Sequence, residues 1–150
     1  MFFNTSTHAM DAKKRLFVPK RFQGALSRDD DGNLFAILTR GQDGCLFLFS
    51  EEGFQKAIER LDTEGFTSRR QRGAQRALFA YADRVTLDAA GRILVPESLR
   101  AHAGLEKDVV LAGVGSRAEI WSQARWEEQL AADDIDFDDI DQILRGDDAD

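Results

Sequence analysis

The chain has 150 residues, of which 43% are hydrophobic and 31% are charged, so it can bury a core as one domain or as two closely joined halves. No apolar run approaches the roughly 18 residues that span a bilayer, and the first residues lack the features of a signal peptide, so we expect a cytoplasmic protein without a membrane partner. A formal net charge of −7 at first argues against a nucleic-acid partner.

The charge is unevenly distributed along the chain. Residues 133–150 hold nine aspartates and one arginine, a local net charge of −8, which leaves the preceding 132 residues at +1. Within that body, residues 13–21 hold five basic side chains and residues 69–76 hold four, with no acidic side chain in either segment. These two segments are the candidate contacts for a polyanion.

Two phrases of the sequence occur twice. The segment "MDAKKRLFVPKRF" at residues 10–22 returns as "LDAAGRILVPESL" at residues 87–99, with the only two prolines in matching places. A second correspondence, shifted by 72 residues, aligns Phe49 and Ser50 with Trp121 and Ser122. A duplication of this size predicts two similar units that bury their apolar faces against each other about a pseudo-two-fold axis.

Each unit begins with two short apolar runs on either side of a turn. Alternating β-branched residues flank "DAKK" and "DAAG", a pattern typical of a β-hairpin. Asp11 and Asp88 can start the turns by bonding to the backbone further on, and Gly91 can take a positive φ without steric cost. Pro19 and Pro96 then end the strand and open a helix.

The later part of each unit reads as two strands followed by a helix. Strands are predicted at 34–41, 45–50, 108–115 and 118–122. Ser50 and Ser122 are suitable N-caps for helices over 51–61 and 123–131. We expect Cys45 to be a small buried hydrophobic residue. The apolar helix positions are expected to face the core, namely Phe54, Ile58, Leu61, Trp126 and Leu130.

A helix with basic residues is predicted between the two units. Ser68 and Gln71 have the spacing of a capping box, and Arg69, Arg72 and Arg76 fall on one stripe. This stripe either faces solvent or contacts a DNA backbone or another subunit. The inward positions are expected to be Ala74, Ala77, Leu78 and Tyr81.

The predicted organisation is a first half at 1–66, a connecting basic helix at 67–82, a second half at 83–132 and an acidic tail at 133–150. The tail lacks a large apolar face and its like charges repel, so we expect it to be disordered, although it could fold on a partner.

The sequence offers little for catalysis. His8 and His102 are the only histidines, the single cysteine cannot build a structural zinc site, and no glycine-rich phosphate loop is present. We therefore expect no enzyme activity, no metal, no cofactor and no small-molecule substrate. The remaining candidate is the first turn, where arginine could meet a phosphate or guanine and lysines add charge. The alternative is an ordinary polar hairpin tip.

The motifs "DAKKRLFVP" and "DAAGRILVP", with "LTRGQDGCLFLFS", "GLEKDVVLAGVGSRAEIWSQARWEEQL" and "FAYAD", resemble the MraZ family, bacterial relatives of the AbrB-type swapped-hairpin DNA-binding proteins. The resemblance covers roughly residues 1–131, and the acidic tail lies outside it. Members commonly have glycine before the motif arginine. Gly91 keeps this residue, but Lys14 departs from it, so Lys14 either bears a strained positive φ or changes the shape of the first turn.

The resemblance implies an α+β, mainly β fold: a double-split β-barrel built from two tandem pseudo-symmetric AbrB-like halves with short peripheral helices. It also implies a ring-shaped homo-oligomer that binds double-stranded DNA at promoter direct repeats of the cell-division and cell-wall gene cluster, including its own gene, in the bacterial nucleoid. The turn-forming residues would be Asp11, Asp88 and Gly91. The DNA-binding residues would be Lys13, Lys14, Arg15, Lys20, Arg21 and Arg92.

A second hypothesis is an oligomeric protein-interaction scaffold that uses the acidic tail or the basic connecting helix. The tail, which DNA would repel, favours this reading.

Overall fold

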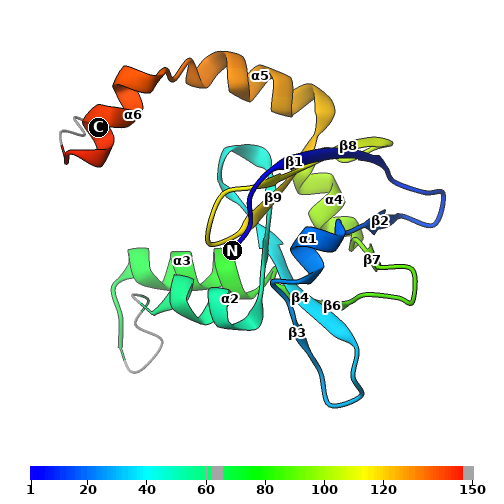
Figure 1. The fold of residues 1–150 in the computed structure, drawn as a ribbon. Coiled ribbons are helices and arrows are strands. Elements are labelled where there is room, and N and C mark those ends of the chain that lie inside the picture. The colour runs from blue at the N-terminus through cyan, green and yellow to red at the C-terminus, as the bar shows by residue number, and fades with distance from the viewer. Residues whose placement is uncertain (60, 62–65, 147–150) are drawn as a thin grey trace.

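The computed structural model describes residues 1–59, 61 and 66–146. It is an α+β structure in which antiparallel strands predominate and short helices lie at the periphery (Figure 1). The described ladders form one seven-stranded and one two-stranded sheet and do not show a closed barrel, so the double-split barrel stays a prediction.

The larger sheet has the strand order β1-β8-β9-β5-β4-β3, with β6 also paired to β4, and the smaller sheet pairs β2 with β7. The strands span Thr5–Ala9 (β1), Arg15–Phe17 (β2), Ser27–Arg28 (β3), Leu34–Arg40 (β4), Leu46–Phe49 (β5), Asp83–Thr86 (β6), Arg92–Leu94 (β7), Asp108–Gly113 (β8) and Ala118–Ser122 (β9).

The helices lie close to their predicted positions, with two additions, a 3₁₀ helix and the helix at the C-terminal end. A short 3₁₀ helix spans Gln42–Gly44 between β4 and β5. The α-helices of the described residues span Lys20–Gln23 (α1), Glu51–Ile58 (α2), Arg69–Phe79 (α3), Glu97–Ala103 (α4), Gln123–Asp133 (α5) and Phe137–Leu144 (α6). None of these helices is long and apolar enough to cross a bilayer.

The predicted hairpins are wrong in one respect. Each turn forms, but the strands on its two sides do not form a ladder with each other. Instead β1 pairs with β8 and its counterpart β6 pairs with β4, while β2 pairs with β7. Each of these ladders joins the first half to the second, so the two halves exchange strands. Local sequence predicts a strand, but the choice of its partner depends on the whole core.

The small ladder has a local two-fold symmetry. Leu16 pairs with Ile93, which is its equivalent in the duplicated phrase, and the flanking pairs are Arg15 with Leu94 and Phe17 with Arg92. In β5 and β9 the central pair is Phe47 with Glu119, which are also equivalent positions. Antiparallel pairing of equivalent residues requires a two-fold axis between them. The pseudo-two-fold predicted from the repeats therefore relates these two pairs of strands.

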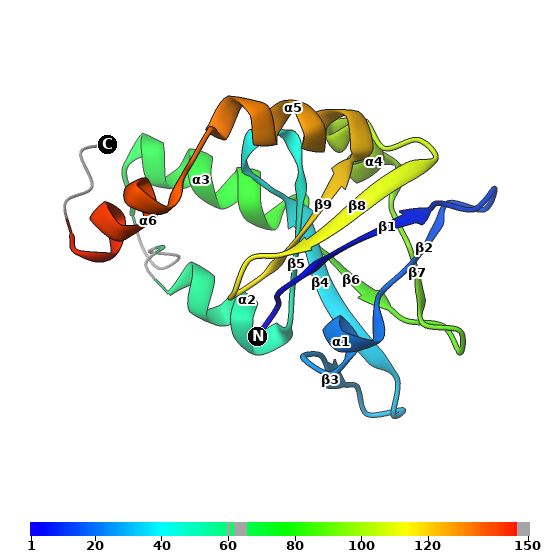
Figure 2. The same cartoon turned by 45° about the horizontal axis from the view of Figure 1, so that its top comes forward.

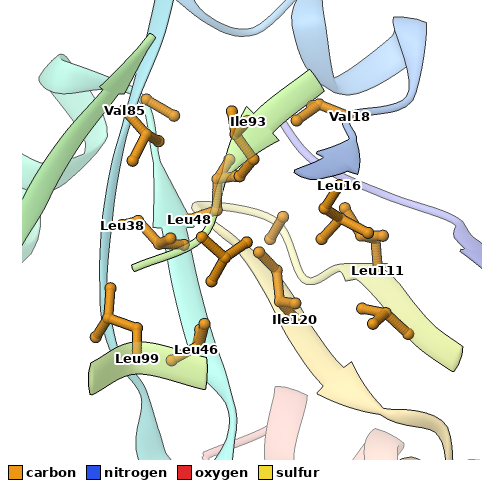
Figure 3. Close-up of a cluster of buried hydrophobic side chains, with 14 of the residues drawn as sticks. Leu16, Val18, Leu38, Leu46, Leu48, Val85, Ile93, Leu99, Leu111 and Ile120 are labelled. Carbon is orange, nitrogen blue, oxygen red and sulfur yellow. The ribbon is translucent and has the colours of Figure 1, made fainter. Parts of the chain in front are cut away.

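Both halves contribute to one hydrophobic core (Figure 3). Leu16 and Val18 of the first half and Ile93 and Val95 of the second have no solvent exposure. They lie with Leu38, Leu48, Leu111 and Ile120 from the larger sheet. Because the cluster is assembled from strands of both halves, neither half buries its apolar surface alone.

The helices begin at their predicted caps, but the capping box predicted at Ser68 is only half formed, because Gln71 Oε1 has no hydrogen-bond partner among the described residues. The predicted inward faces are covered only in part. The hydroxyls of Ser50, Ser68 and Ser122 accept bonds from the backbone N–H groups three residues further on, at 3.0 to 3.2 Å. However, α2, α3 and α5 contain no fully buried residue. Leu130 is about half exposed, and Ala74, Ala77 and Tyr81, expected to face inward, are exposed. The packed part consists of Phe54, which lies edge-on to Phe49 and Phe79, and Trp126, which packs against the cluster of Cys45, Val110 and Trp121.

The acidic tail also differs from the expectation of disorder. Helix α6 begins at a capping box in which the side chains of Asp136 and Asp139 each accept a bond from the other's backbone N–H. Aspartates in its first turn also favour the positive end of the helix dipole, so their charge stabilises the helix start. The expected disorder of residues 147–150 lies outside the described residues.

Cys45 is buried, as predicted. Its thiol donates to the Gln42 carbonyl at 3.1 Å, and it packs with Val110 and Trp121. Burial, reinforced by the nearby Glu119 carboxylate, raises the pKa of the Cys45 thiol to about 12. The thiol is therefore protonated and inert in the folded chain.

The shared core predicts different costs for neighbouring substitutions. Leu16→Ala should lower the free energy of unfolding by about 2–5 kcal/mol because it leaves a cavity where the halves meet. The control is Leu94→Ala, which lies in the partner strand but is 60% exposed, and should change stability by less than about 0.5 kcal/mol. Denaturant unfolding at a fixed protein concentration measures both. Equal losses would contradict the shared core.

Candidate nucleic-acid interface

The first turn is closed by its aspartate. Asp11 Oδ1 accepts bonds from the backbone N–H groups of Lys13 and Arg15, each at 2.9 Å. Asp11 Oδ2 accepts from Arg15 Nε at 2.8 Å, and the Lys14 N–H donates to the Asp11 carbonyl at 3.0 Å. One carboxylate thus fixes both the backbone of the turn and the guanidinium that follows it.

The second turn repeats this geometry. Asp88 Oδ1 accepts from the N–H groups of Ala90 and Arg92 at 3.0 and 2.9 Å, and Asp88 Oδ2 accepts from Arg92 Nε at 2.9 Å. The Gly91 N–H donates to the Asp88 carbonyl at 2.9 Å. The turn-forming roles predicted for these aspartates and for Gly91 match the geometry of both turns.

The residue before each arginine has a left-handed backbone conformation. Gly91 has φ +80°, and a Cβ there would collide with Nε2 of Gln23. The left-handed φ favours glycine, and a side chain there would also have to displace the flexible end of Gln23. Lys14 has φ +64° at the equivalent place, so the first turn keeps its shape despite the lysine. Such a conformation costs a lysine on the order of 1 kcal/mol.

The two turns are bonded across the halves. The Val18 N–H donates to the Gly91 carbonyl at 2.9 Å, and the Val95 N–H donates to the Lys14 carbonyl at 3.1 Å. Each left-handed residue thus presents its carbonyl to the strand of the opposite half. A change in the shape of one turn would break a bond to the other.

Two supporting side chains were missed by the sequence reasoning. Gln23 Nε2 donates to the Val18 carbonyl at 2.8 Å, and Arg100 donates through Nη1 to the Val95 carbonyl. Gln23 and Arg100 occupy equivalent positions, 77 residues apart, in the duplicated phrase. Their equivalent positions on the helix after each proline could have indicated a shared role. Their different residue types made this equivalence hard to recognise.

The cross-bonding brings the two Asp–Arg pairs into one cluster. Arg92 Nη1 lies 3.8 Å from Asp11 Oδ2, while the side chains of Arg15 and Arg92 remain about one-third exposed. The N–H bond from Arg15, together with its guanidinium, holds the pKa of the Asp11 carboxyl below its ordinary value of 3.8. The equivalent bonds from Arg92 lower the pKa of Asp88. Both carboxylates are thus charged and engaged at neutral pH.

The other predicted basic residues all belong to the first half, in its turn and on α1. Lys13 and Lys14 are exposed in the turn, whereas the second turn has Ala90 and Gly91 there. Lys20 and Arg21 are exposed on α1, at the far end of β2 (Figure 1). The Asp–Arg pairs are neutral, so the lysines give the first turn a net charge of +2 and the second turn none. The structure groups Arg15 with Arg92 and places Lys20 and Arg21 apart from them.

The described residues contain no group of three or more histidine, cysteine, aspartate or glutamate side chains suited to a metal ion. What the cluster offers instead is a fixed set of N–H donors and positive charges on two adjoining turns. Such a set can contact an anionic, acceptor-rich surface.

Comparisons with known proteins agree with the duplication. A family model described as "MraZ protein, putative antitoxin-like" matches residues 1–77 and again residues 78–146. The second match continues through α6, so the tail expected to lie outside the resemblance is inside it up to residue 146.

Several relatives carry the name "Transcriptional regulator MraZ". The protein of Heliobacterium modesticaldum is 43% identical over 148 residues, covering 92% of this chain and 99% of the relative. Those of Pediococcus pentosaceus and Clostridium beijerinckii are 39% and 40% identical, covering 96% and 93% of this chain and 96% and 94% of the relatives. On this similarity, and on the family match to both halves, the chain belongs to the MraZ family.

Proposed function

We propose that this protein is a sequence-specific DNA-binding transcriptional regulator that works as a ring-shaped homo-oligomer. Its targets are short direct repeats in the promoter of the cell-division and cell-wall gene cluster, which includes its own gene. The observation that carries the proposal is the pair of Asp–Arg turns, fixed across the two halves and charged on one side by Lys13 and Lys14. The names of the relatives support the regulatory role.

Arginine in this setting suits contact with DNA. A guanidinium has five N–H donors, and the bond from Arg15 Nε to Asp11 uses one of them. The remaining donors can meet a phosphate or the acceptor edge of guanine as a planar fork. Because the turn is already fixed by its own bonds, binding would cost little further conformational entropy.

The difference in charge assigns the larger role to the first turn. Phosphates attract Lys13 and Lys14 as point charges, and Lys20 and Arg21 extend the positive surface along the chain. The second turn, with Gly91 before Arg92, contributes its arginine but no neighbouring lysine. Several subunits on successive repeats would add weak contacts into useful affinity.

The acidic end of the chain is compatible with this surface. Helix α6 lies at the end of the molecule opposite the two turns in both views (Figures 1 and 2). Its aspartates therefore stand away from the proposed DNA contact within one chain. For the fold, the exchange of strands between the halves supports the proposed AbrB-like double-split barrel.

The proposal predicts unequal effects at the two arginines. Arg15→Ala should weaken specific promoter binding at least about tenfold, because a guanine contact worth about 1–3 kcal/mol is lost in each subunit. Arg92→Ala removes an equivalent ion pair from the turn without lysines and should cost less. Gel shifts at moderate salt, with the oligomer checked by light scattering, measure both.

The same assay separates the regulator from the scaffold. Wild-type binding should fall steeply between low and physiological salt as counterions are released. If Arg15→Ala bound promoter DNA as tightly as wild type, Arg15 would not be a DNA-contacting residue. If the wild-type protein showed no retention on promoter DNA even at low salt, the scaffold reading would replace the regulator.

The lowered pKa of Asp11 predicts that the first turn loses stability in acid. Since the pKa of Asp11 is lower in the folded chain than its ordinary 3.8, the turn's contribution to stability is present above about pH 4. It is lost as the pH falls through the folded value. In Arg15→Gln the backbone N–H bond remains but the guanidinium is gone, so the pKa of Asp11 should rise part of the way to 3.8. Carboxyl titration by NMR checks this, with Asp88 as the internal control; an unchanged Asp11 would contradict the role of the ion pair.

A further inference from the structure

Helices α5 and α6 form an arm that extends from the body of the molecule (Figures 1 and 2). Most residues in the second half of α5 are exposed, and α6 has no buried residue. Between the helices, Asp134 takes a left-handed conformation with φ +42°, which turns the chain. The arm thus places α6 away from the hydrophobic core.

Helix α6 has one apolar and one acidic side. Phe137, Ile140 and Leu144 recur at the helical spacing of three and four residues, and Phe137 is 87% exposed. Asp138 and Asp139 lie on other sides of the helix, whereas Asp141 flanks the apolar side and pairs with Arg145 at 3.0 Å. An eight-residue helix is marginal in water without tertiary packing. Packing of its apolar side against a partner surface would therefore stabilise the helix.

Helix α3 offers a surface of complementary chemistry. It has no acidic residue and no buried residue, and its arginines are exposed. No ion pair between described residues neutralises them. Gly73, Ala77 and Ala80 form an exposed stripe of small residues at spacings of four and three. A side chain added at Gly73 would meet nothing within 4 Å, so this stripe is open to a neighbouring helix. The arginines are Arg69, Arg70, Arg72 and Arg76.

We propose that α6 of one chain docks on α3 of a second copy. The apolar side of α6 covers the small-residue stripe, which lets two helices approach closely, and its aspartates face the arginines on either side. The proposal rests on the homo-oligomer proposed above and assigns one of its contacts. It gives the basic connecting helix and the acidic tail a joint role.

The second copy is favoured over the same chain by the structure itself. Helices α3 and α6 lie at the same end of one molecule, yet both surfaces remain exposed (Figures 1 and 2). The arm directs α6 outward, where another molecule can meet it. The basic turns of a second copy are a poorer partner for α6, because they offer charge without a stripe of small residues.

Cross-linking between two single-cysteine variants tests the contact. Ala77→Cys places a thiol on the α3 stripe, and Ile140→Cys places one on the apolar side of α6. Cys45 is buried and inert, so the wild-type chain supplies the background. A mixture of the two variants, treated with a short bis-maleimide, should give a covalent dimer that neither variant gives alone.

The outcomes separate this inference from the proposed oligomer. A mixture that forms no more dimer than wild type, while light scattering shows the oligomer intact, overturns the docking of α6 on α3. A further variant carries both cysteines in one chain. If it cross-links only within one chain, both at high dilution and in the oligomer, the choice of a second copy is overturned. A wild-type chain that is monomeric at every concentration overturns the oligomer itself.

Charge reversal provides a second arm of the test. Arg72→Asp with Arg76→Asp in the Ala77→Cys chain should reduce the yield of the mixed dimer several-fold. Asp138→Arg with Asp141→Arg in the Ile140→Cys chain should restore it, which a merely unfolded helix would not do. Asp30→Arg with Asp31→Arg, in an exposed loop far along the chain, is the matched control and should leave the yield unchanged. Equal loss in the control would contradict a specific contact.

Discussion

Two backbone hydrogen bonds join the two turns across the halves of this molecule. Val18 donates to the carbonyl of Gly91, and Val95 donates to the carbonyl of Lys14. Both carbonyls point correctly only because the residues that bear them are left-handed, and both valines are buried in the shared core. The shape of each turn, the exchange of strands and the closure of the core are therefore one constraint, satisfied together.

This constraint explains why the duplicated motif keeps the same turn in both copies while the two copies differ in charge. In the second copy, Gly91 packs against Gln23, so a side chain there would displace the Gln23 amide from the Val18 carbonyl. In the first copy, Lys14 accepts the same backbone conformation and directs its charge to solvent. The strain at Lys14 is small beside the bonds that over-determine the turn. The first turn can thus carry a positive surface while the second keeps the architecture.

Local sequence patterns predicted the turns, the helix caps and the buried cysteine. They did not predict the features that depend on long-range contacts. The aspartate-led turns, the serine caps and the buried Cys45 follow from residues within a few positions of one another, so the sequence sufficed. Which strand pairs with which, and that Leu130 and Tyr81 stay exposed, depend on the three-dimensional closure of the sheet. The order of α6 was missed because its charge was counted but its capping box at Asp136 was not. The basic residues proposed to contact DNA remain predictions.

The first turn, held rigid by the second, is proposed to contact repeated DNA segments. A footprint of the protein on the DNA upstream of its own gene tests this most directly. Several short segments with the same sequence should be protected at regular spacing, because successive subunits present the same turn. Uniform weak protection without such a repeat, or no protection at low salt, would contradict it.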